Sequence, residues 1–419
     1  MRAFDDWHFR TARVMITRDS LQQLVDLTKE ERFRKAIKEL EIYAVTFDDK
    51  TRTNLHNQPV TELESRALKE VLIKNNIDAN TYKPQPRPPK HPEPPIRPPG
   101  VAAFEAKLRR KRRRLHDKHK HDQNRIRTAG IDLDLLAQAI QNLPALRMIR
   151  TVRHLAPQHL PLGVGALKDD IGMWPITRCI PHSVPLILGA LHKSGAQLEC
   201  LDLQDVPRYI PLALTSTSRK ASRTSTPART FAQSQFSELN MSKTRRFCIL
   251  LTWSMPYARA VPPPQVPSTS WIACVLRRMH HLRELRITHP VKTQPDMLQH
   301  LNSENIFLPE LRALELVRGF VVVAALRDFL AKHSSTLQRI LCVGLRKREV
   351  GDSDTHVASA RILDLLRALA MPQLRHVELL ENMRERPKKL APGEHVIAGT
   401  TVEEFTRNLQ KSWQVDGQL

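Results

Sequence analysis

The chain has 419 residues, 41% of them hydrophobic, and a formal net charge of +23. The apolar fraction is that of a globular protein with a sizeable core, which excludes an intrinsically disordered chain. Five widely spaced cysteines without a C-x-x-C pair exclude a disulfide framework and favour an intracellular location, cytoplasmic or nuclear. No apolar run reaches the roughly 18 residues that a membrane helix needs, so no membrane partner is expected.

The amino-terminal segment, residues 1–80, is predicted to hold a strand, a helix and the first repeat. The strand is expected over residues 6–16, with Val14 and Ile16 on one side. Thr17 or Asp19 is expected to cap the helix that follows. A short helix then leads from Glu31 into the first copy of a phrase that recurs along the chain.

That phrase is Leu-x-x-Leu-x-Leu with conservative variants. Its copies begin at Ile37, Leu198, Phe236, Leu282, Leu311, Leu337 and Leu374, with a degraded copy at Leu146. Such a phrase is typical of leucine-rich repeats, in which a strand and a returning helix bury their apolar faces by stacking on neighbouring copies. The sequence therefore predicts an α/β fold: an irregular leucine-rich-repeat-like solenoid of short parallel strands alternating with helices, mainly over residues 131–412.

Insertions of foreign composition interrupt the repeats. Residues 81–100 are a proline-rich linker, for which polyproline II or disorder is expected. Residues 101–130 are a basic helical segment, and 131–140 form an amphipathic helix that ends before Pro144. Flexible insertions rich in Ser, Thr and Pro are expected near residues 213–235 and 256–270.

The basic segment admits three interpretations. It is a solvated helix face, a nuclear import signal, or a patch that contacts nucleic-acid phosphates. Nucleic acid is disfavoured as a partner because the segment lacks interleaved aromatic residues and matches no common nucleic-acid motif. The residues of the candidate import signal are Lys107, Arg109, Arg110, Lys111, Arg112, Arg113 and Arg114.

Catalytic chemistry has little support in the sequence. The chain contains no G-x-G-x-x-G, no phosphate-binding G-x-x-x-x-G-K-[ST] and no G-x-S-x-G. His116, His119 and His121 form H-x-x-H-x-H, but they lie in a basic run without acidic or cysteine ligands nearby. No catalytic residue, cofactor or metal is predicted, and the chain is not expected to be an enzyme.

A candidate binding surface follows from strand alternation. Within each phrase the leucines point inward, so the residue between the last two leucines faces the opposite, concave surface. These predicted contact residues are Glu41, Arg150, Asp202, Asn240, Arg286, Glu315, Leu341 and Glu378. Their mixed charges fit a protein ligand better than the uniformly basic groove that nucleic acid requires.

Several of these phrases resemble those of the fungal F-box and leucine-rich-repeat-like proteins, a large group of ascomycete sequences. The matching stretches are 9–11 with Arg13-Val14, 33–43, the charged helix before Leu135-Leu136, 143–147, and 308–316 with 333–337. In that family an amino-terminal F-box binds the adaptor of a cullin-based ubiquitin ligase, and the repeats capture the protein to be ubiquitylated. The F-box, a three-helix motif opening with a Leu-Pro pair, would precede Met1.

The expected function is therefore protein–protein interaction. The resemblance implies the substrate-binding repeat region of an F-box-type ubiquitin ligase receptor that lacks a recognisable F-box. The partners would be an unidentified protein ligand and, by resemblance, the ligase adaptor and cullin. The alternative is a nuclear, nucleic-acid-associated protein that acts through the basic segment 107–120.

Overall fold

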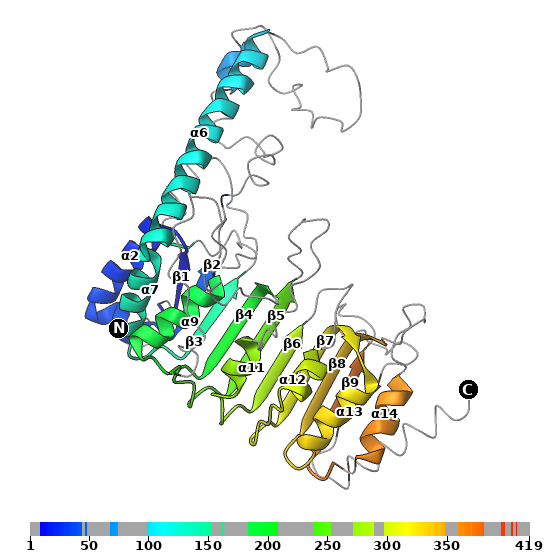
Figure 1. Cartoon of the computed structure of the whole chain (residues 1–419). Helices are drawn as coiled ribbons and strands as arrows, with labels where there is room; N and C mark the ends of the chain where they lie inside the picture. The colour runs from blue at the N-terminus through cyan, green and yellow to red at the C-terminus, as the bar shows by residue number, and fades with distance from the viewer. Residues whose placement is uncertain are drawn as a thin grey trace, which may run out of the picture.

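The fold is α/β, with a parallel sheet whose strands alternate with helices (Figure 1). The computed structural model describes residues 9–43, 47, 68–73, 99–152, 161–162, 183–207, 238–252, 271–288, 297–347, 359–369, 371–380, 395–398, 404 and 408. The strands are β1 (Thr11–Met15), β2 (Glu39–Tyr43), β3 (Met148–Val152), β4 (Cys200–Pro207), β5 (Arg246–Thr252), β6 (Glu284–Thr288), β7 (Ala313–Val321), β8 (Arg339–Lys347), β9 (His376–Leu380) and β10 (His395–Ala398). The helices are α2 (Arg18–Lys29), α3 (Glu31–Ala36), α6 (Pro99–Ala129), α7 (Ile131–Gln141), α9 (Ser183–Ser194), α11 (Trp271–Leu276), α12 (Met297–Ser303), α13 (Val323–Lys332) and α14 (Ser359–Ala368).

The strands follow one another across the sheet in chain order. β1 to β9 pair in parallel, and β10 joins β9 in the antiparallel sense. Each parallel pair needs a crossover connection, and a helix supplies it where the connection is described. This arrangement confirms the predicted α/β solenoid. The amino-terminal strands β1 and β2 belong to the same continuous sheet as the later repeats.

The leucines of the repeated phrase build the core. Leu40, Leu201 and Leu314 are fully buried, and they pack in one cluster with helix residues such as Ile187 and Phe329. Alternate strand residues point to the opposite face, as the period of two requires. Helices α9, α11, α12 and α13 lie on one side of the sheet in Figure 1. The sheet therefore has a helix-covered face and a face turned away from these helices.

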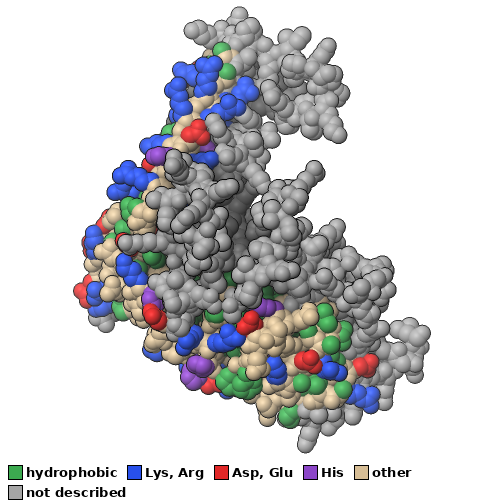
Figure 2. Space-filling view, in the orientation of Figure 1, with side chains coloured by type: hydrophobic (Ala, Val, Ile, Leu, Met, Phe, Trp, Pro, Cys, Tyr) green, Lys and Arg blue, Asp and Glu red, His purple; other side chains and the backbone are tan. Residues whose placement is uncertain are grey.

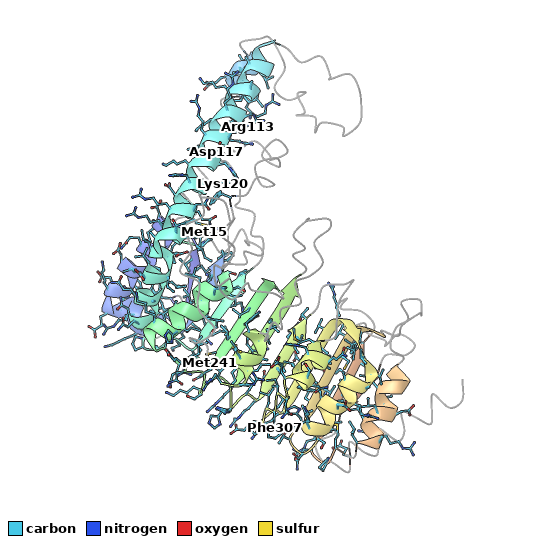
Figure 3. The ribbon with its side chains drawn as sticks, viewed as in Figure 1. Met15, Arg113, Asp117, Lys120, Met241 and Phe307 are labelled. Carbon is cyan, nitrogen blue, oxygen red and sulfur yellow. The ribbon has the colours of Figure 1, made fainter. Side chains whose placement is uncertain are left out.

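A tight turn precedes most strands and sets where they begin. The N–H of Leu146 donates to the carbonyl of Leu143, and the N–H of Leu311 donates to that of Leu308 in the same way. Met241 and Phe307 lie at this lower edge of the solenoid in Figure 3. We call it the amino edge, because every parallel strand begins there.

A ladder of backbone hydrogen bonds runs along the amino edge. The carbonyl of the residue just before the strand accepts two N–H groups from the next strand: that of Lys38 binds Arg147 and Met148, and that of Arg283 binds Arg312 and Ala313. The same pattern links every consecutive pair from β1 to β9. Main-chain bonds therefore hold the positions along this edge, whatever the side chains are.

The predicted amino-terminal strand and helices are present, but β1 covers Thr11–Met15, and Phe9, Arg10 and Ile16 of the expected range 6–16 lie outside it. Of the two candidate caps for α2, Thr17 is the one used, since its Oγ1 accepts from the Ser20 N–H at 3.4 Å. The long helix α6 leads into α7 through Gly130, whose φ of 69° lies in the left-handed region. Figures 1 and 2 show α6 extending away from the sheet, with Lys and Arg side chains gathered along it. None of the described helices has the length and apolarity required to cross a membrane.

The predicted boundary of the proline-rich linker needs correction, and other predicted segments fall outside the described residues. Helix α6 begins at Pro99, inside the predicted proline-rich linker, because proline is tolerated in the first turn of a helix, where its missing N–H is not needed. The rest of the linker, 81–98, and the predicted insertions 213–235 and 256–270 lie outside the described residues.

Candidate interaction surface

The predicted contact residues, apart from Asn240, lie in one row across the sheet. Strand register places Glu41 beside Arg150, Arg150 beside Asp202, and Arg286 beside Glu315. Leu341 and Glu378 continue the row on β8 and β9, and Arg13 extends it to β1. We call this surface the polar face. Its row is Arg13, Glu41, Arg150, Asp202, Cys248, Arg286, Glu315, Leu341 and Glu378.

The placement of Asn240 on a strand was wrong. Asn240 is exposed before β5, and its Oδ1 accepts from the Ser242 hydroxyl at 2.8 Å. Strand β5 begins at Arg246, so Cys248 occupies the position in the row.

The phrase that forms strand β5 differs from the others by polar and aromatic substitutions. Thr244 stands where the first leucine is expected; it is fully buried, and its hydroxyl donates to the Leu198 carbonyl at 3.0 Å. Phe247 and Ile249 fill the other two positions. One signal was available in the sequence: Met241-x-x-Thr244 has the spacing of Leu143-x-x-Leu146 and Leu308-x-x-Leu311, which form the turns before β3 and β7.

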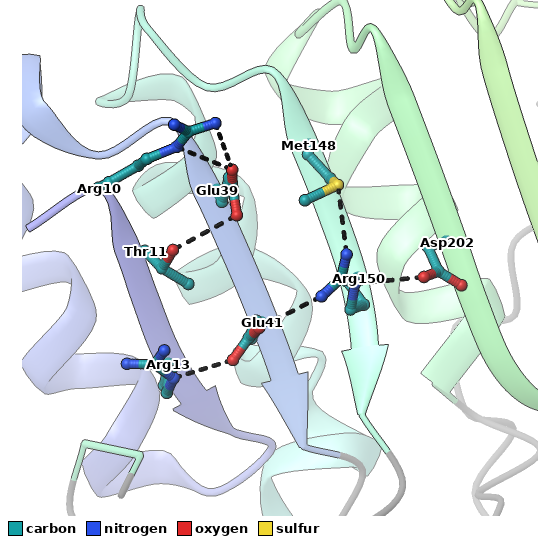
Figure 4. Close-up of polar contacts among 8 residues, drawn as sticks. All are labelled: Arg10, Thr11, Arg13, Glu39, Glu41, Met148, Arg150 and Asp202. Carbon is teal, nitrogen blue, oxygen red and sulfur yellow. Dashed lines mark hydrogen bonds and ion pairs between the residues drawn. The ribbon is translucent and has the colours of Figure 1, made fainter. Parts of the chain in front are cut away.

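The charges on the first half of the polar face are paired with one another (Figure 4). Arg13 Nε contacts Glu41 Oε2 at 2.9 Å, and Glu41 Oε1 lies 3.6 Å from Arg150 Nη1. Arg150 Nε in turn donates to Asp202 Oδ2 at 3.2 Å. Opposite charges on adjacent strands attract one another because their side chains project from the same face.

A second set of ion pairs covers the other half of this face. Glu315 lies 3.6 Å from Arg286 and 3.5 Å from Arg339. Arg339 also reaches Glu378 at 3.7 Å, and the His376 ring contacts the same carboxylate. The polar face is therefore mixed in charge, and its described charges largely neutralise one another.

The middle of the polar face is less polar. Burial raises the pKa of Asp202, although Arg150 opposes the shift. Burial also raises the pKa of the Cys200 thiol to about 12 and shifts that of the Cys248 thiol upward. Both cysteines are therefore uncharged thiols at neutral pH, with little of the thiolate character that nucleophilic chemistry requires.

The candidate import signal lies on α6. Lys107, Arg110, Lys111, Arg113 and Arg114 are exposed, Arg109 is half-buried and Arg112 is buried. Figure 3 shows Arg113, Asp117 and Lys120 along the part of α6 that extends from the sheet. The structure thus places a basic helix on the outside of the protein, and import remains a prediction.

The base of α6 is attached to the sheet end through polar and aromatic contacts. The Gln123 amide donates to the Ile16 carbonyl at 3.2 Å. The rings of His116 and His119 lie 5.8 and 5.3 Å from that of Phe47, so these two histidines of the H-x-x-H-x-H run take part in aromatic packing. Among the described residues, no three His, Cys, Asp or Glu side chains are grouped as a metal site would need.

No protein-family model matches the sequence, and no curated protein matches it significantly.

Proposed function

We propose that this chain is a protein–protein interaction module, rather than an enzyme, acting in the cytoplasm or nucleus. The observation that carries the proposal is the continuous parallel sheet, which leaves a row of charged side chains in register from β1 to β9. Stacked repeats of this kind produce extended surfaces that bind other proteins. The mixed charge of the row suits a protein surface with charges of both signs.

The resemblance to fungal F-box and leucine-rich-repeat-like proteins suggests a more specific role. In this proposal the repeats are the substrate-binding region of an F-box-type ubiquitin ligase receptor. The ligase adaptor and cullin would then be partners in addition to the captured protein. This more specific role is supported only by the resembling stretches named above, such as Leu308–Leu316.

Affinity capture from a cell extract tests both levels of the proposal. The bait is the full chain, and the control is a chain of the same composition with scrambled repeats. Mass spectrometry scores the adaptor, the cullin and all other proteins retained. Enrichment of adaptor and cullin supports the receptor role. Their absence, with other proteins enriched, removes the ligase role and keeps the interaction module. If the chain retains no more than the control, the interaction proposal fails.

A matched surface variant locates the contact. Leu341 is the aliphatic member of the row and lies between Glu315 and Glu378. Leu341→Arg changes the polar face without removing any of the ion pairs described above. Loss of captured proteins in this variant, with unchanged circular dichroism, would place the ligand on the polar face.

The basic helix α6 supports a second candidate function, association with nucleic acid. Its exposed Arg110, Lys111 and Arg114 lie on a helix that extends from the sheet. The triple substitution Arg110→Gln, Lys111→Gln and Arg114→Gln distinguishes the two functions. A nucleic-acid binder loses affinity and part of its salt dependence, whereas a protein receptor keeps its ligand.

A further inference from the structure

The residues just before the strands form a second, mainly cationic row, separate from the polar face. They are the residues whose carbonyls or N–H groups make the backbone ladder of the amino edge. This amino-edge row consists of Arg10, Lys38, Arg147, Glu199, Arg245, Arg283, Arg312, Gln338 and Arg375. Only Glu199 and Gln338 are not basic. Members on adjacent strands are held about 4.8 Å apart by the strand spacing.

The two rows differ in how their charges are satisfied. On the polar face the arginines described above contact carboxylates. On the amino edge Arg245, Arg312 and Arg375 are exposed, and none of them makes an ion pair with a described residue. Arg245 and Arg312 lie two strand spacings apart, as do Arg312 and Arg375. This separation of roughly 10 Å is close to the Debye length of about 8 Å at physiological salt. Their potentials therefore overlap, and no ion pair with a described residue neutralises these three charges.

Acidic residues divide this row into paired and unpaired cations. Glu199 lies 3.9 Å from Arg147. Glu310 lies 2.7 Å from the His281 ring and 3.5 Å from Arg283. The His281 hydrogen bond is the main reason that the pKa of Glu310 is lowered, so this carboxylate stays ionised. Arg10, at the start of the row, pairs with Glu39 at 2.9 Å. The arginines of the row without an ion pair to a described residue are therefore Arg245, Arg312 and Arg375.

The amino edge also contains a pocket and an exposed apolar side chain. A pocket of about 360 Å³ opens there, lined by Glu199, Ser242, Lys243, Arg245, His281, Arg283 and Glu310. Phe307 is 61% exposed just before the turn that carries Glu310, and one side of its ring stacks on His333 with centroids 5.6 Å apart. Figure 2 shows Lys, Arg and His side chains interspersed with acidic ones along this lower edge.

We propose that the amino edge binds an acidic, extended peptide segment of the partner protein. Its carboxylates pair with Arg245, Arg312 and Arg375, and an apolar side chain packs on Phe307. This inference rests on the proposed interaction function, because it names the chemistry and location of the partner. From Arg245 to Arg375 the edge spans four strand spacings, roughly 19 Å, which an extended segment of about six residues covers.

Nucleic acid fits this edge less well than an acidic peptide. Glu199 lies in the row and Glu310 lies beside Arg283. Both repel a phosphate backbone, which places a charge at every nucleotide. A single-stranded nucleic acid also gains affinity from stacking on successive aromatic rings. Phe307 is the one exposed large aromatic side chain among the described residues, and His333 already covers one side of it.

The test uses a fluorescent peptide in which Asp, Glu and Asp stand three residues apart, about 10 Å in an extended chain, with Ser at the positions between them except for one Leu. Its control is the same peptide with Asn and Gln in place of the acids. The variant is Arg245→Glu with Arg312→Glu and Arg375→Glu, and the charge-matched control is Arg110→Glu with Lys111→Glu and Arg114→Glu on α6. We expect the edge variant to bind the acidic peptide about 30-fold more weakly, because each of its three substitutions should weaken binding roughly threefold. The α6 control should stay within about twofold of wild type by the same scale.

Three outcomes would overturn this inference. The first is that the neutral peptide binds as tightly as the acidic one. The second is that both triple variants lose affinity equally. The third is that a single-stranded oligonucleotide of equal charge outcompetes the peptide at the same residues. The backbone ladder does not depend on these side chains, so the edge variant should retain wild-type circular dichroism. If it does not fold, the corresponding triple glutamine variant replaces it.

Repeating the extract capture with the edge variant separates this inference from the proposed function. If wild type retains no specific protein, the interaction function itself fails. If wild type retains proteins and the edge variant retains them equally, the function stands and the amino edge is not the site. Loss confined to the edge variant, reversed by competition with the acidic peptide, supports the inference.

Discussion

Replacing Glu41 by Gln should destabilise the fold measurably, because this carboxylate joins three strands. It contacts Arg13 at 2.9 Å and Arg150 at 3.6 Å, and its side chain is only 15% exposed. An exposed ion pair contributes about 0.2–1 kcal/mol, and a charge-assisted hydrogen bond about 1.5–3 kcal/mol. We assign about 1 kcal/mol to the half-buried Arg13 contact and about 0.5 kcal/mol to the more exposed Arg150 contact. The free energy of unfolding should therefore fall by about 1.5 kcal/mol.

Urea unfolding followed by circular dichroism measures this change, provided that the slope with denaturant is unchanged. In an Arg13→Met background the Glu41→Gln substitution should cost only the remaining Arg150 contact, about 0.5 kcal/mol. Glu284→Gln is the matched control, since its pair with Arg246 is about half exposed and should contribute less. A cost below about 0.3 kcal/mol for Glu41→Gln, or an equal cost in both backgrounds, would refute the view that these charges stabilise one another.

Three further predictions concern buried polar groups. Burial lowers the pKa of His333, whose Nε2 accepts from the Leu308 N–H at 3.0 Å. At acidic pH the unfolded chain therefore binds more protons at this residue than the folded protein does. The free energy of unfolding should fall as pH drops below about 6.5. His333→Gln should flatten the dependence between neutral and acidic pH in urea titrations, and an unchanged slope would contradict this assignment. Thr244→Val should lower the free energy of unfolding by about 1 kcal/mol, because it leaves the Leu198 carbonyl unpaired. Thr244→Ala should lower it further, because it also opens a cavity. A valine variant as stable as wild type, or more stable, would contradict this role of the hydroxyl. Burial raises the pKa of Cys342 to about 12, so this thiol should react with a disulfide reagent far more slowly in native buffer than in urea. Mass spectrometry of the labelled peptide measures the two rates. Comparable rates would show that the site opens readily.

Much of the fold could be predicted from the sequence because the repeated phrase encodes burial directly. Leu311, Leu314 and Leu316 read as one copy, and all three are buried around β7. The fifth strand was missed because Thr244 and Phe247 replace leucines there. Thr244 is acceptable at a core position since the Leu198 carbonyl satisfies its hydroxyl, and only tertiary structure shows that partner.

The candidate surface could be predicted only in part. Strand alternation correctly placed residues such as Glu41 and Arg286 on the face opposite the leucines. It did not show that these charges neutralise one another, because pairing depends on register between strands far apart in the chain. Arg245, Arg312 and Arg375 were overlooked for the same reason. In the sequence Arg312 and Arg375 are isolated arginines and Arg245 has only Arg246 and Lys243 nearby, whereas the block from Lys107 to Arg114 is almost continuously basic.

The long separation between β2 and β3 has a consequence for how this architecture can change. Tyr43 and Met148 end and begin strands that pair directly, although a long stretch of chain connects them. The entropy of closing such a loop rises only logarithmically with its length, by about 0.6 kcal/mol for each doubling. The strand carboxyl ends can therefore accept added segments at small thermodynamic cost, while the short turns at the other edge keep the repeats aligned. Insertions are therefore expected after the strands, at their carboxyl ends, whereas the amino edge keeps its geometry.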